Sequence, residues 1–595
     1  MSKKEHKPMT FGRTILASAI GVFIAIQVSC IILFFIFAAS LASALSSSSS
    51  DQMPVTGTHL AVELDLTQPI YERKPTEIAT LFGERGGTSL EQLLTALHLA
   101  ATDPAVDALY LHLGGSNIAW AQAEELMLAL HTFGQQCSKP ILAYGESLSQ
   151  TEYFLATVAD KICVHPSGTI DFRGIGAEVL FYKGLLDKLG VHMQLIRPTS
   201  CAYKSAGEPY IRTDMSDANR QQVHAYINSI WDYATSVMAH NRGLTPQQLN
   251  HLADNLAGYI PQEALQAGLI DTLCFAQDMR SLLHDSCGVA KIVKANRYAA
   301  QYQAPKSADK ITLIYAEGDV VPGRSTGSQT AVYGDDIVRA LHTAVHDKHV
   351  KAIVLRVNSP GGAVTASEAM THAVCEARKV KPVVVSMSGM AASAGYEMSC
   401  FATTIVAHPT TLTGSIGVFA TVPEISQLLR QKLGITTDTV ATNRNATGAT
   451  LTRPLSPQAQ AKMQQSVEDF YITFTQRVAD GRGLRRTYVD SIARGRVWTG
   501  LQAQANGLVD TLGGLPLAIQ IAAQHAGIVN QGYTLRVLPA QKSLWEQILD
   551  QVDADQEEQI QSRLNALIPF YSTLHRWSTM EPLQARLPFE LKVEN

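Results

Sequence analysis

The apolar residues of this chain follow two distinct patterns. From Ile15 to Ala44 they form one almost uncharged run, ILASAIGVFIAIQVSCIILFFIFAASLASA. Further along, short β-branched runs such as 311–315 and 352–357 alternate with segments of helical spacing such as 366–379. Continuous apolar strands separated by helices are typical of β–α–β units around a mostly parallel sheet. The pattern therefore predicts one long apolar segment followed by an α/β body.

The apolar run predicts a transmembrane anchor, because about 20 apolar residues span a bilayer and this run is longer. Four basic residues precede it: Lys3, Lys4, Lys7 and Arg13. The next basic residue after the run is Arg73. Positive charge favours the cytoplasmic side, so the chain beyond the anchor is predicted to lie outside the cytoplasm. Ala42-Ser43-Ala44 also resembles a cleavage site, which leaves removal of the segment as a signal peptide open.

Composition predicts the segments that flank the body. Residues 1–14 are predicted as a basic cytoplasmic tail, 15–45 as the anchor, and 46–56 as a serine-rich flexible tether. Beyond residue 540 the sequence becomes helical in pattern and acidic. We therefore predict that 541–595 forms a helical tail used for packing or assembly.

The body contains an internal repeat at a spacing of about 243 residues. VDALYLHLGGSN from Val106 recurs as VKAIVLRVNSPGG from Val350, and ALQAGLIDTL recurs as AQANGLVDTL. Three further matches lie between these two, in the same order in both copies. A repeat of this kind marks duplicated structural units. We therefore predict two copies of one α/β domain, at 57–300 and 301–540.

Composition narrows the classes of function. The net charge of -4 provides no basic field that would gather phosphates, so a nucleic-acid partner is not expected. The eight cysteines are scattered singly without a CxxC pair, which predicts neither a zinc site nor a disulfide framework. No GxxxxGK[ST] sequence occurs, so a phosphate-binding P-loop is excluded. We expect no metal and no cofactor.

A glycine-rich loop provides the first candidate for chemistry. NSPGGAVTASE, from Asn358 to Glu368, follows a predicted strand and opens a predicted helix. Gly361 and Gly362 permit positive φ and a close approach of the backbone to a ligand. Free amides at the amino end of a helix can hold the oxyanion of an acyl-transfer intermediate. A purely structural turn is the alternative interpretation.

Two serines in small-residue settings are candidate nucleophiles. Ser415 in TGSIG has glycine on both sides, which leaves room for an extended peptide, and Ser393 in GMAASAGY is predicted to begin a helix. A serine hydroxyl needs a base, and His408 is the only histidine close to either serine in sequence. Its counterpart His165 occurs in the other copy, which has no matching nucleophile. That match favours a structural role for both histidines.

A comparison of the two copies provides another base, Lys204 in YKSAGEP. This lysine corresponds to Gly448 in the second copy, whereas the stretch that corresponds to TGSIG in the first copy, DFRGIG, contains no serine. One copy therefore has the amine and the other has the hydroxyl, which predicts one site assembled from both domains. The amine must be neutral to act as a base, and burial would lower its pKa from about 10.4. A solvated surface lysine is the alternative.

These features together resemble a known family. The anchor, the tandem repeat and the motifs YKSAGEP, NSPGG, GMAASAGY and TLTGSIGVF resemble signal peptide peptidase A of the long, tandem-domain bacterial type, also called protease IV, over about residues 15–540. The resemblance implies a Clp protease/crotonase-like fold in each copy and a serine endopeptidase with a Ser–Lys dyad. It also implies a homotetramer that degrades cleaved signal peptides and other hydrophobic peptides. The catalytic domains would lie on the periplasmic face of the bacterial cytoplasmic membrane, held by a single transmembrane pass.

The resemblance also implies residue roles. The nucleophile falls on Ser415 and the general base on Lys204, and the oxyanion donors on backbone amides near Gly361 or Gly362 and near Ile416. Two alternatives remain open from the residues: a Clp-like site of Ser393 with His408 as base, and a membrane-tethered scaffold without activity. An acyl-CoA enzyme of the crotonase type is disfavoured by export, because CoA is an intracellular cofactor.

Overall fold

The computed structural model describes residues 57–73, 87–116, 118–302, 307–325, 331–539 and 584–586. The predicted cytoplasmic tail, anchor and tether lie outside the described residues, as does the predicted helical tail apart from 584–586. Within the described ranges, no helix combines the length and the apolar character needed to cross a bilayer.

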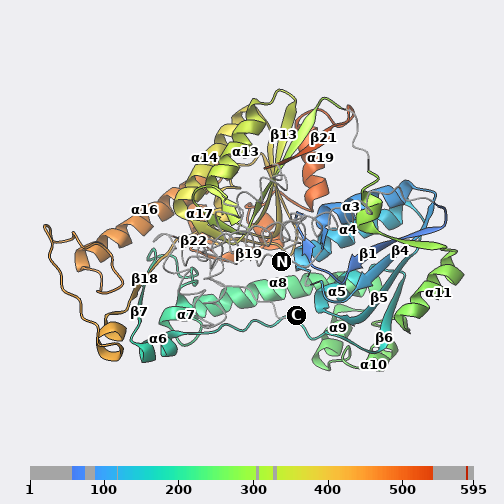
Figure 1. Cartoon of the computed structure of the whole chain (residues 1–595), viewed down its shortest axis with the longest axis horizontal. Helices are drawn as coiled ribbons and strands as arrows, with labels where there is room; N and C mark the ends of the chain where they lie inside the picture. Colours follow the sequence, from blue (N-terminus) through green and yellow to red (C-terminus); the bar gives the residue numbers. More distant parts are fainter. Residues whose placement is uncertain are drawn as a thin grey trace, which may run out of the picture.

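The first copy of the repeat forms a six-stranded parallel sheet (Figure 1). Its central strands are mostly apolar and buried, and their charged side chains occupy the exposed or partly exposed positions. In spatial order the strands are β8 (Thr272–Leu273), β6 (Lys161–Ile170), β5 (Ile141–Leu148), β4 (Val106–Leu113), β1 (Leu60–Leu66) and β9 (Lys291–Lys294).

Helices cover both faces of this first sheet. One face packs against α3 (Leu90–Thr102), α4 (Trp120–Gln136), α5 (Gln150–Ala156), α9 (Pro246–Asp254), α10 (Pro261–Gln266) and α12 (Ala295–Ala299). The other face packs against α11 (Ala276–Cys287), where Met279 and Leu283 contact the cluster around Tyr110 and Tyr144. Two short strands, β2 (Ile70–Tyr71) and β3 (Thr88–Ser89), pair beside this domain.

The second copy forms an eight-stranded sheet that is parallel except for the β17–β19 pair. Along the main path its strands are β19 (Val497–Thr499), β17 (Leu412–Gly414), β15 (Val383–Ala392), β13 (Val350–Ser359), β10 (Lys310–Glu317) and β21 (Thr534–Leu538). The other two strands, β16 (Thr404–Ala407) and β20 (Thr511–Leu512), extend from β15.

Helices again cover both faces of the second sheet. One face packs against α13 (Gly334–His346), α14 (Val364–Val380), α15 (Ala394–Glu397), α16 (Pro457–Arg482), α17 (Arg486–Ile492) and α18 (Gly500–Ala505). The other face packs against α19 (Leu515–His525). The predicted α/β class and the duplication are therefore present as two covered parallel-type sheets, one in each copy.

A small sheet lies beside the glycine-rich loop. Its strand order is β12 (Ala331–Tyr333), β11 (Asp319–Val321), β14 (Gly361–Ala363) and β22 (Gln584–Arg586). Gly361 and Gly362 thus lie in a short strand, and α14 begins only at Val364. The glycine-rich stretch therefore follows a strand and opens a helix as predicted, with the short strand β14 between them.

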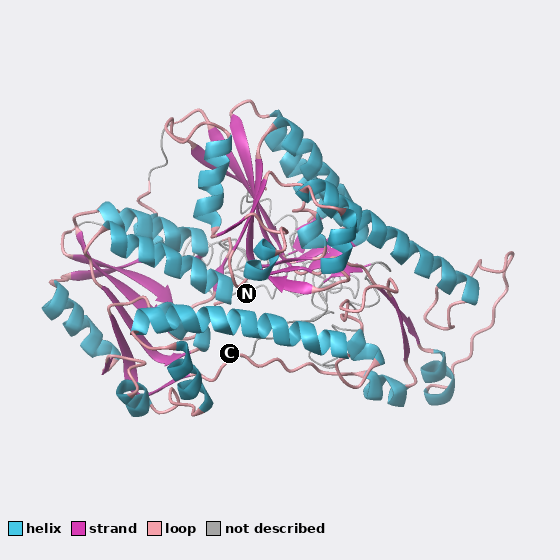
Figure 2. Cartoon of the chain, turned by 180° about the vertical axis from the view of Figure 1, so that it is seen from behind, coloured by secondary structure: helices cyan, strands magenta, loops and turns pink. Residues whose placement is uncertain are grey.

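The long helix α8 (Asp217–Arg242) connects the two copies. In Figure 1 it runs beneath the second sheet, from α7 (Glu208–Ile211) at one end to α9 at the other, and Figure 2 shows the same helix from behind. Ser216 caps its amino end, and Gly243 ends it in the left-handed conformation at φ 66°. The helix contacts β19 of the second copy.

One strand from each copy forms a projecting ribbon. β7 (His192–Ile196) pairs antiparallel with β18 (Ala420–Glu424), with Ile196 opposite Ala420. The ribbon and its flanking elements, α6 (Lys183–Leu189) and η1 (Leu428–Lys432), form an arm at one end of the molecule (Figures 1 and 2). Along the sequence, Lys204 follows the end of β7 at Ile196, and Ser415 precedes the start of β18 at Ala420. This pairing brings the two predicted half-sites together.

A buried ion cluster also joins the copies. Arg356 on β13 donates to Glu72 Oε2 at 2.8 Å and to Glu125 Oε2 at 2.7 Å. Both carboxylates belong to the first copy, and all three side chains are almost completely buried. Burial raises the pKa of Glu125, but the Arg356 charge, His408 and the Leu515 amide together outweigh it and hold this pKa well below its usual range. The cluster therefore provides a charged contact at the domain interface that only the correct docking satisfies.

Candidate active site

Lys204 is buried between two serine hydroxyls. Its Nζ lies 2.8 Å from Ser393 Oγ and 3.0 Å from Ser415 Oγ, and it also lies 3.0 Å from the Ser415 carbonyl oxygen. The lysine side chain has 0% exposure to solvent. A neutral amine has two N–H bonds and one lone pair, so it can donate to two of these oxygens while accepting the proton of a hydroxyl.

Burial lowers the pKa of Lys204 from 10.5 to about 7, and the nearby Cys201 thiol opposes that shift only weakly. The physical cause is desolvation, which disfavours the charged ammonium. No carboxylate contacts the amine among the described residues, so no ion pair stabilises the charged form. A substantial fraction of Lys204 is therefore neutral near pH 7, as a general base requires.

The backbone around Lys204 is fixed by contacts with both copies. Tyr203 N donates to Arg494 O at 3.1 Å, and Arg197 Nη1 donates to Lys204 O at 2.8 Å. A Cβ atom built on Gly495, which has φ +80°, would lie 2.6 Å from the Lys204 Cβ and backbone nitrogen. Only glycine permits this close approach. The lysine is thus held rigidly against the domain that carries both serines.

Ser393 lies at a strained turn between β15 and α15. Its backbone has φ 57° and ψ -115°, and its amide donates to Gly414 O at 2.8 Å. A non-glycine residue at positive φ in such a turn is uncommon, and it persists only when the surroundings hold it there. A sharp strand-to-helix turn of this kind presents a serine hydroxyl away from the backbone of its own sheet.

The glycine strand β14 lies against this same turn. A Cβ built on Gly361 would be 3.0 Å from the amide nitrogen of Ala394 and 3.0 Å from the carbonyl oxygen of Ala392. These are the two residues that flank Ser393. Gly361 has φ +104°, so a side chain there is excluded by both conformation and space. The predicted oxyanion strand therefore borders Ser393.

Ser415 lies on the lysine side of the site. It has φ 49°, and its amide donates to Arg496 O at 2.7 Å. The next residue, Ile416, accepts a hydrogen bond from Gly495 N through its carbonyl at 2.8 Å. The predicted contact between Lys204 and Ser415 is present. The backbones of Ser415 and Ile416 bind residues 495–496, the loop that packs on Lys204.

The alternative pair of Ser393 with His408 is not joined by a hydrogen bond in the described residues. His408 is buried with its Nε2 3.2 Å from Glu125 Oε2, and its backbone amide donates to Thr411 Oγ1. The ring therefore belongs to the interdomain ion cluster, whereas the Ser393 hydroxyl contacts Lys204. The sequence comparison did not pair Ser393 with Lys204, although the same half-site reasoning applies to both serines of the second copy.

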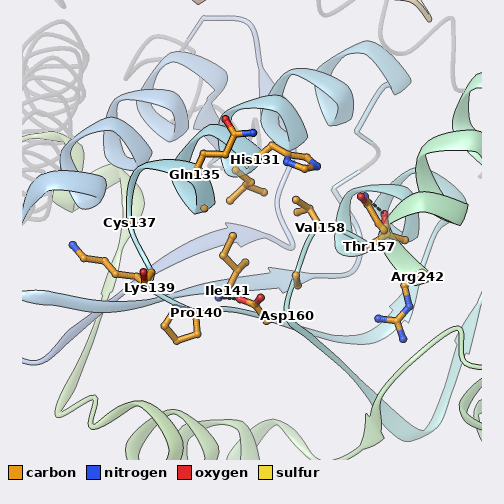
Figure 3. Close-up of a pocket in the computed structure, with 15 residues that line it drawn as sticks. His131, Gln135, Cys137, Lys139, Pro140, Ile141, Thr157, Val158, Asp160 and Arg242 are labelled. Carbon is orange, nitrogen blue, oxygen red and sulfur yellow. Dashed lines mark hydrogen bonds between the residues drawn. The ribbon is translucent and has the colours of Figure 1, made fainter.

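A separate open pocket of about 580 Å³ lies on the first domain (Figure 3). Its charged side chains are already satisfied by the protein: Lys139 donates to Ala100 O and Asp103 O, and Arg242 pairs with Asp271. Arg242 is the last residue of α8. Lys204 lies near the other end of this helix, where Gln222 Nε2 donates to the carbonyl of the adjacent Tyr203. Twenty helical residues span about 30 Å, so this pocket is remote from the two serines.

A buried lysine amine of lowered pKa that contacts two serine hydroxyls is the arrangement expected of a serine hydrolase. The model of the Clp protease family matches residues 303–410. Among solved structures, ClpP1 from Listeria monocytogenes matches at 14% identity and a TM-score of 0.21, covering 34% of this chain and 89% of that chain.

The model of peptidase family S49 matches residues 134–290 and 376–529. "Protease 4" of Salmonella typhi is 36% identical over 499 residues, covering 81% of this chain and 79% of that protein. "Protease 4" of Haemophilus influenzae is 33% identical and covers 73% and 72%. "Serine protease SPPA, chloroplastic" of Arabidopsis thaliana is 30% identical and covers 76% and 68%. The chain therefore belongs to peptidase family S49, and it is a serine protease.

Proposed function

We propose that this protease is an endopeptidase with a Ser–Lys dyad, in which Ser393 is the nucleophile and Lys204 the general base. The observation that carries the proposal is the buried Lys204 amine, which lies 2.8 Å from the hydroxyl of Ser393, a residue with a strained backbone. The glycine strand beside the Ser393 turn adds amides where an oxyanion would form. Ser415 then orients the lysine through its hydroxyl and its carbonyl.

The proposed mechanism follows from these roles. Neutral Lys204 takes the proton of Ser393 while the Ser393 oxygen attacks a peptide carbonyl carbon. Backbone amides of Gly362 and Ala394 stabilise the negative charge that develops on the carbonyl oxygen. The Lys204 ammonium then gives its proton to the leaving amine. Water, deprotonated by the same amine, attacks the acyl carbon, and as the bond to the Ser393 oxygen breaks the Lys204 ammonium returns a proton to that oxygen.

The sequence analysis assigned the nucleophile to Ser415, and that assignment is the second candidate here. It is favoured by the 3.0 Å contact between Ser415 Oγ and Lys204 Nζ. Ser393 is preferred because the glycine strand borders its flanking residues, whereas an acyl-transfer site needs oxyanion donors beside the nucleophile. The two assignments differ in which substitution, Ser393→Ala or Ser415→Ala, should abolish peptide hydrolysis.

Cleaved signal peptides and other hydrophobic peptides are the proposed substrates. The resemblance to signal peptide peptidase A supports this choice, and the long apolar run at 15–44 supports tethering at a membrane where such peptides accumulate. We place the catalytic domains on the periplasmic side of the bacterial cytoplasmic membrane, because basic residues precede the run.

We also propose that the protease assembles as a homotetramer through the projecting arm. The arm exposes apolar side chains that a monomer in water would not favour: Leu180, Leu185, Leu189, Leu433 and Ile435. Changing Leu433 and Ile435 together to glutamate is expected to lower the mass measured by light scattering to that of smaller species. Val380→Glu, at a site 63% exposed on α14, is the matched control and should leave the mass unchanged. An unchanged mass in the double variant would argue against assembly through the arm.

The dyad is tested by the pH dependence of peptide hydrolysis. Protonated Lys204 has no lone pair, so kcat/KM for a hydrophobic peptide is expected to rise with pH and to reach half of its plateau near the Lys204 pKa of about 7. Lys204→Met is expected to lower kcat/KM by about 10²- to 10⁴-fold and to remove this rise.

The matched control is Lys188→Met, which changes an exposed lysine on α6 and should keep both rate and pH profile. Wild-type activity in Lys204→Met would contradict the dyad. An inactive scaffold, the other alternative from the sequence, would show no hydrolysis in any of these proteins.

A further inference from the structure

A short segment of the chain lies in a strand-wide groove beside the proposed nucleophile. β22 pairs antiparallel with the glycine strand β14 on one side, with Ala585 opposite Gly362. On its other side, Gln584 exchanges two backbone hydrogen bonds with Phe419, at 3.0 Å and 2.8 Å. The segment therefore fills the space between β14 and Phe419 with extended backbone, and Ala585 has 0% exposure.

The backbone of this segment is oriented as a peptide substrate would be. The amide and the carbonyl of Gln584 both face Phe419, and successive residues of a strand turn these groups to opposite sides. The carbonyl of Ala585 therefore faces the glycine strand. A Cβ built on Gly361 would lie 2.2 Å from this carbonyl oxygen and 3.0 Å from the amide nitrogen of Ala394. The Ala585 carbonyl thus lies close to the amide that follows Ser393.

Side chains add a specific contact to the backbone pairing. Arg586 Nη2 lies 3.0 Å from Asp319 Oδ1, at the start of β11. Gln584 is also almost completely buried, with 5% exposure. A second extended peptide cannot enter the same groove while these residues occupy it, because interiors leave no room for an additional strand.

We infer that Gln584–Arg586 is an intramolecular competitor that occupies the substrate groove and must leave before an extended peptide can bind. The inference rests on the proposed function, because it identifies the groove beside Ser393 as the binding site for substrate. An edge strand such as β14 binds extended peptides through its backbone, and the occupied groove has that geometry. The apparent affinity for substrate then equals the affinity of the open groove multiplied by the fraction of molecules in which the groove is open.

Peptide binding to the full chain tests this inference independently of catalysis. The background is Ser393→Ala, so that the probe, a fluorescein-labelled decapeptide of alternating leucine and alanine, is not cut. Ala585→Glu introduces a carboxylate at a fully enclosed position, and Arg586→Glu places like charges together at Asp319. Both changes are expected to release the segment and to lower the Kd of the probe, by about tenfold or more for Ala585→Glu.

Arg586→Lys is the matched control, since it keeps the charge that faces Asp319 and should leave the Kd within about twofold of the background protein. The charge exchange Asp319→Arg with Arg586→Asp should restore the weaker binding. Far-ultraviolet circular dichroism establishes that each variant is folded. A Kd that is unchanged or raised in both Ala585→Glu and Arg586→Glu would overturn the inference and identify β22 as a permanent strand.

The same substitutions in the protein with Ser393 intact separate this inference from the proposed function. We expect Ala585→Glu to lower KM with kcat nearly unchanged. Absence of hydrolysis in every variant, with the Kd still lowered, would reject the endopeptidase and retain the competitor. Hydrolysis at an unaltered KM, with the Kd also unaltered, would reject the competitor alone.

Discussion

Ser393→Ala is expected to lower kcat/KM for peptide hydrolysis by about four orders of magnitude or more, whereas Ser415→Ala is expected to lower it by about ten- to a hundredfold. The first change removes the atom that forms the covalent intermediate. The second removes one hydrogen bond to a group that becomes charged during the reaction, and such a bond contributes about 1.5–3 kcal/mol. The Ser415 carbonyl remains in place to hold the amine.

Ser399→Ala is the matched control for these two substitutions. Its hydroxyl is equally buried and lies six residues beyond Ser393, but it donates only to Gly395 O at 2.7 Å. Its activity should stay within about threefold of the parent. A reversed order, with Ser415→Ala inactive and Ser393→Ala active, would assign the nucleophile to Ser415.

Arg356→Met is expected to lower the free energy of unfolding by about 3–5 kcal/mol. The substitution keeps much of the side-chain volume but leaves Glu72 and Glu125 buried without their common counter-charge. It also removes the donors to Ser386 and Ser388. The two carboxylates come from the first copy and the arginine from the second. The lost stability is therefore that of the interface between the domains. Urea unfolding followed by tryptophan fluorescence measures the effect.

The control for this prediction is Arg536→Met. Arg536 pairs with Asp347 at 2.9 Å, but its side chain is 36% exposed, so the pair contributes about 1 kcal/mol or less. Equal small losses in the two variants would contradict a structural role for the buried cluster. The Lys204 site should also lose activity in Arg356→Met, because the amine and Ser393 belong to different copies.

Much of the fold could be predicted from periodicity and repetition. Mostly apolar runs such as 352–357, in which Arg356 is the exception, predicted strands buried on both faces, and β13 is buried throughout that run. The comparison of copies also predicted that an amine of the first copy meets a hydroxyl of the second. That contact is present between Lys204 and Ser415, while the catalytic roles remain predictions.

The sequence could not rank the two serines, because the difference between them is conformational. Both serines have positive φ, and what sets Ser393 apart is the approach of Gly361 to the residues beside it, which depends on how β14 docks against the β15–α15 turn. Pairing of residues 584–586 with β14 joins positions more than 200 residues apart, and no local pattern indicates it. The same limit applies to His408, whose contact with Glu125 crosses the domain interface.

Covalent labelling followed by peptide mapping tests the central claim most directly. The full chain is treated at pH 8 with a diphenyl phosphonate ester that carries an apolar peptide, and the modified residue is identified by mass spectrometry. A Ser–Lys dyad at Ser393 predicts a single adduct on Ser393, formed with a rate that falls as pH drops below about 7 and that is lost in Lys204→Met. An adduct on Ser415, or labelling of Ser393 that persists in Lys204→Met, would contradict it.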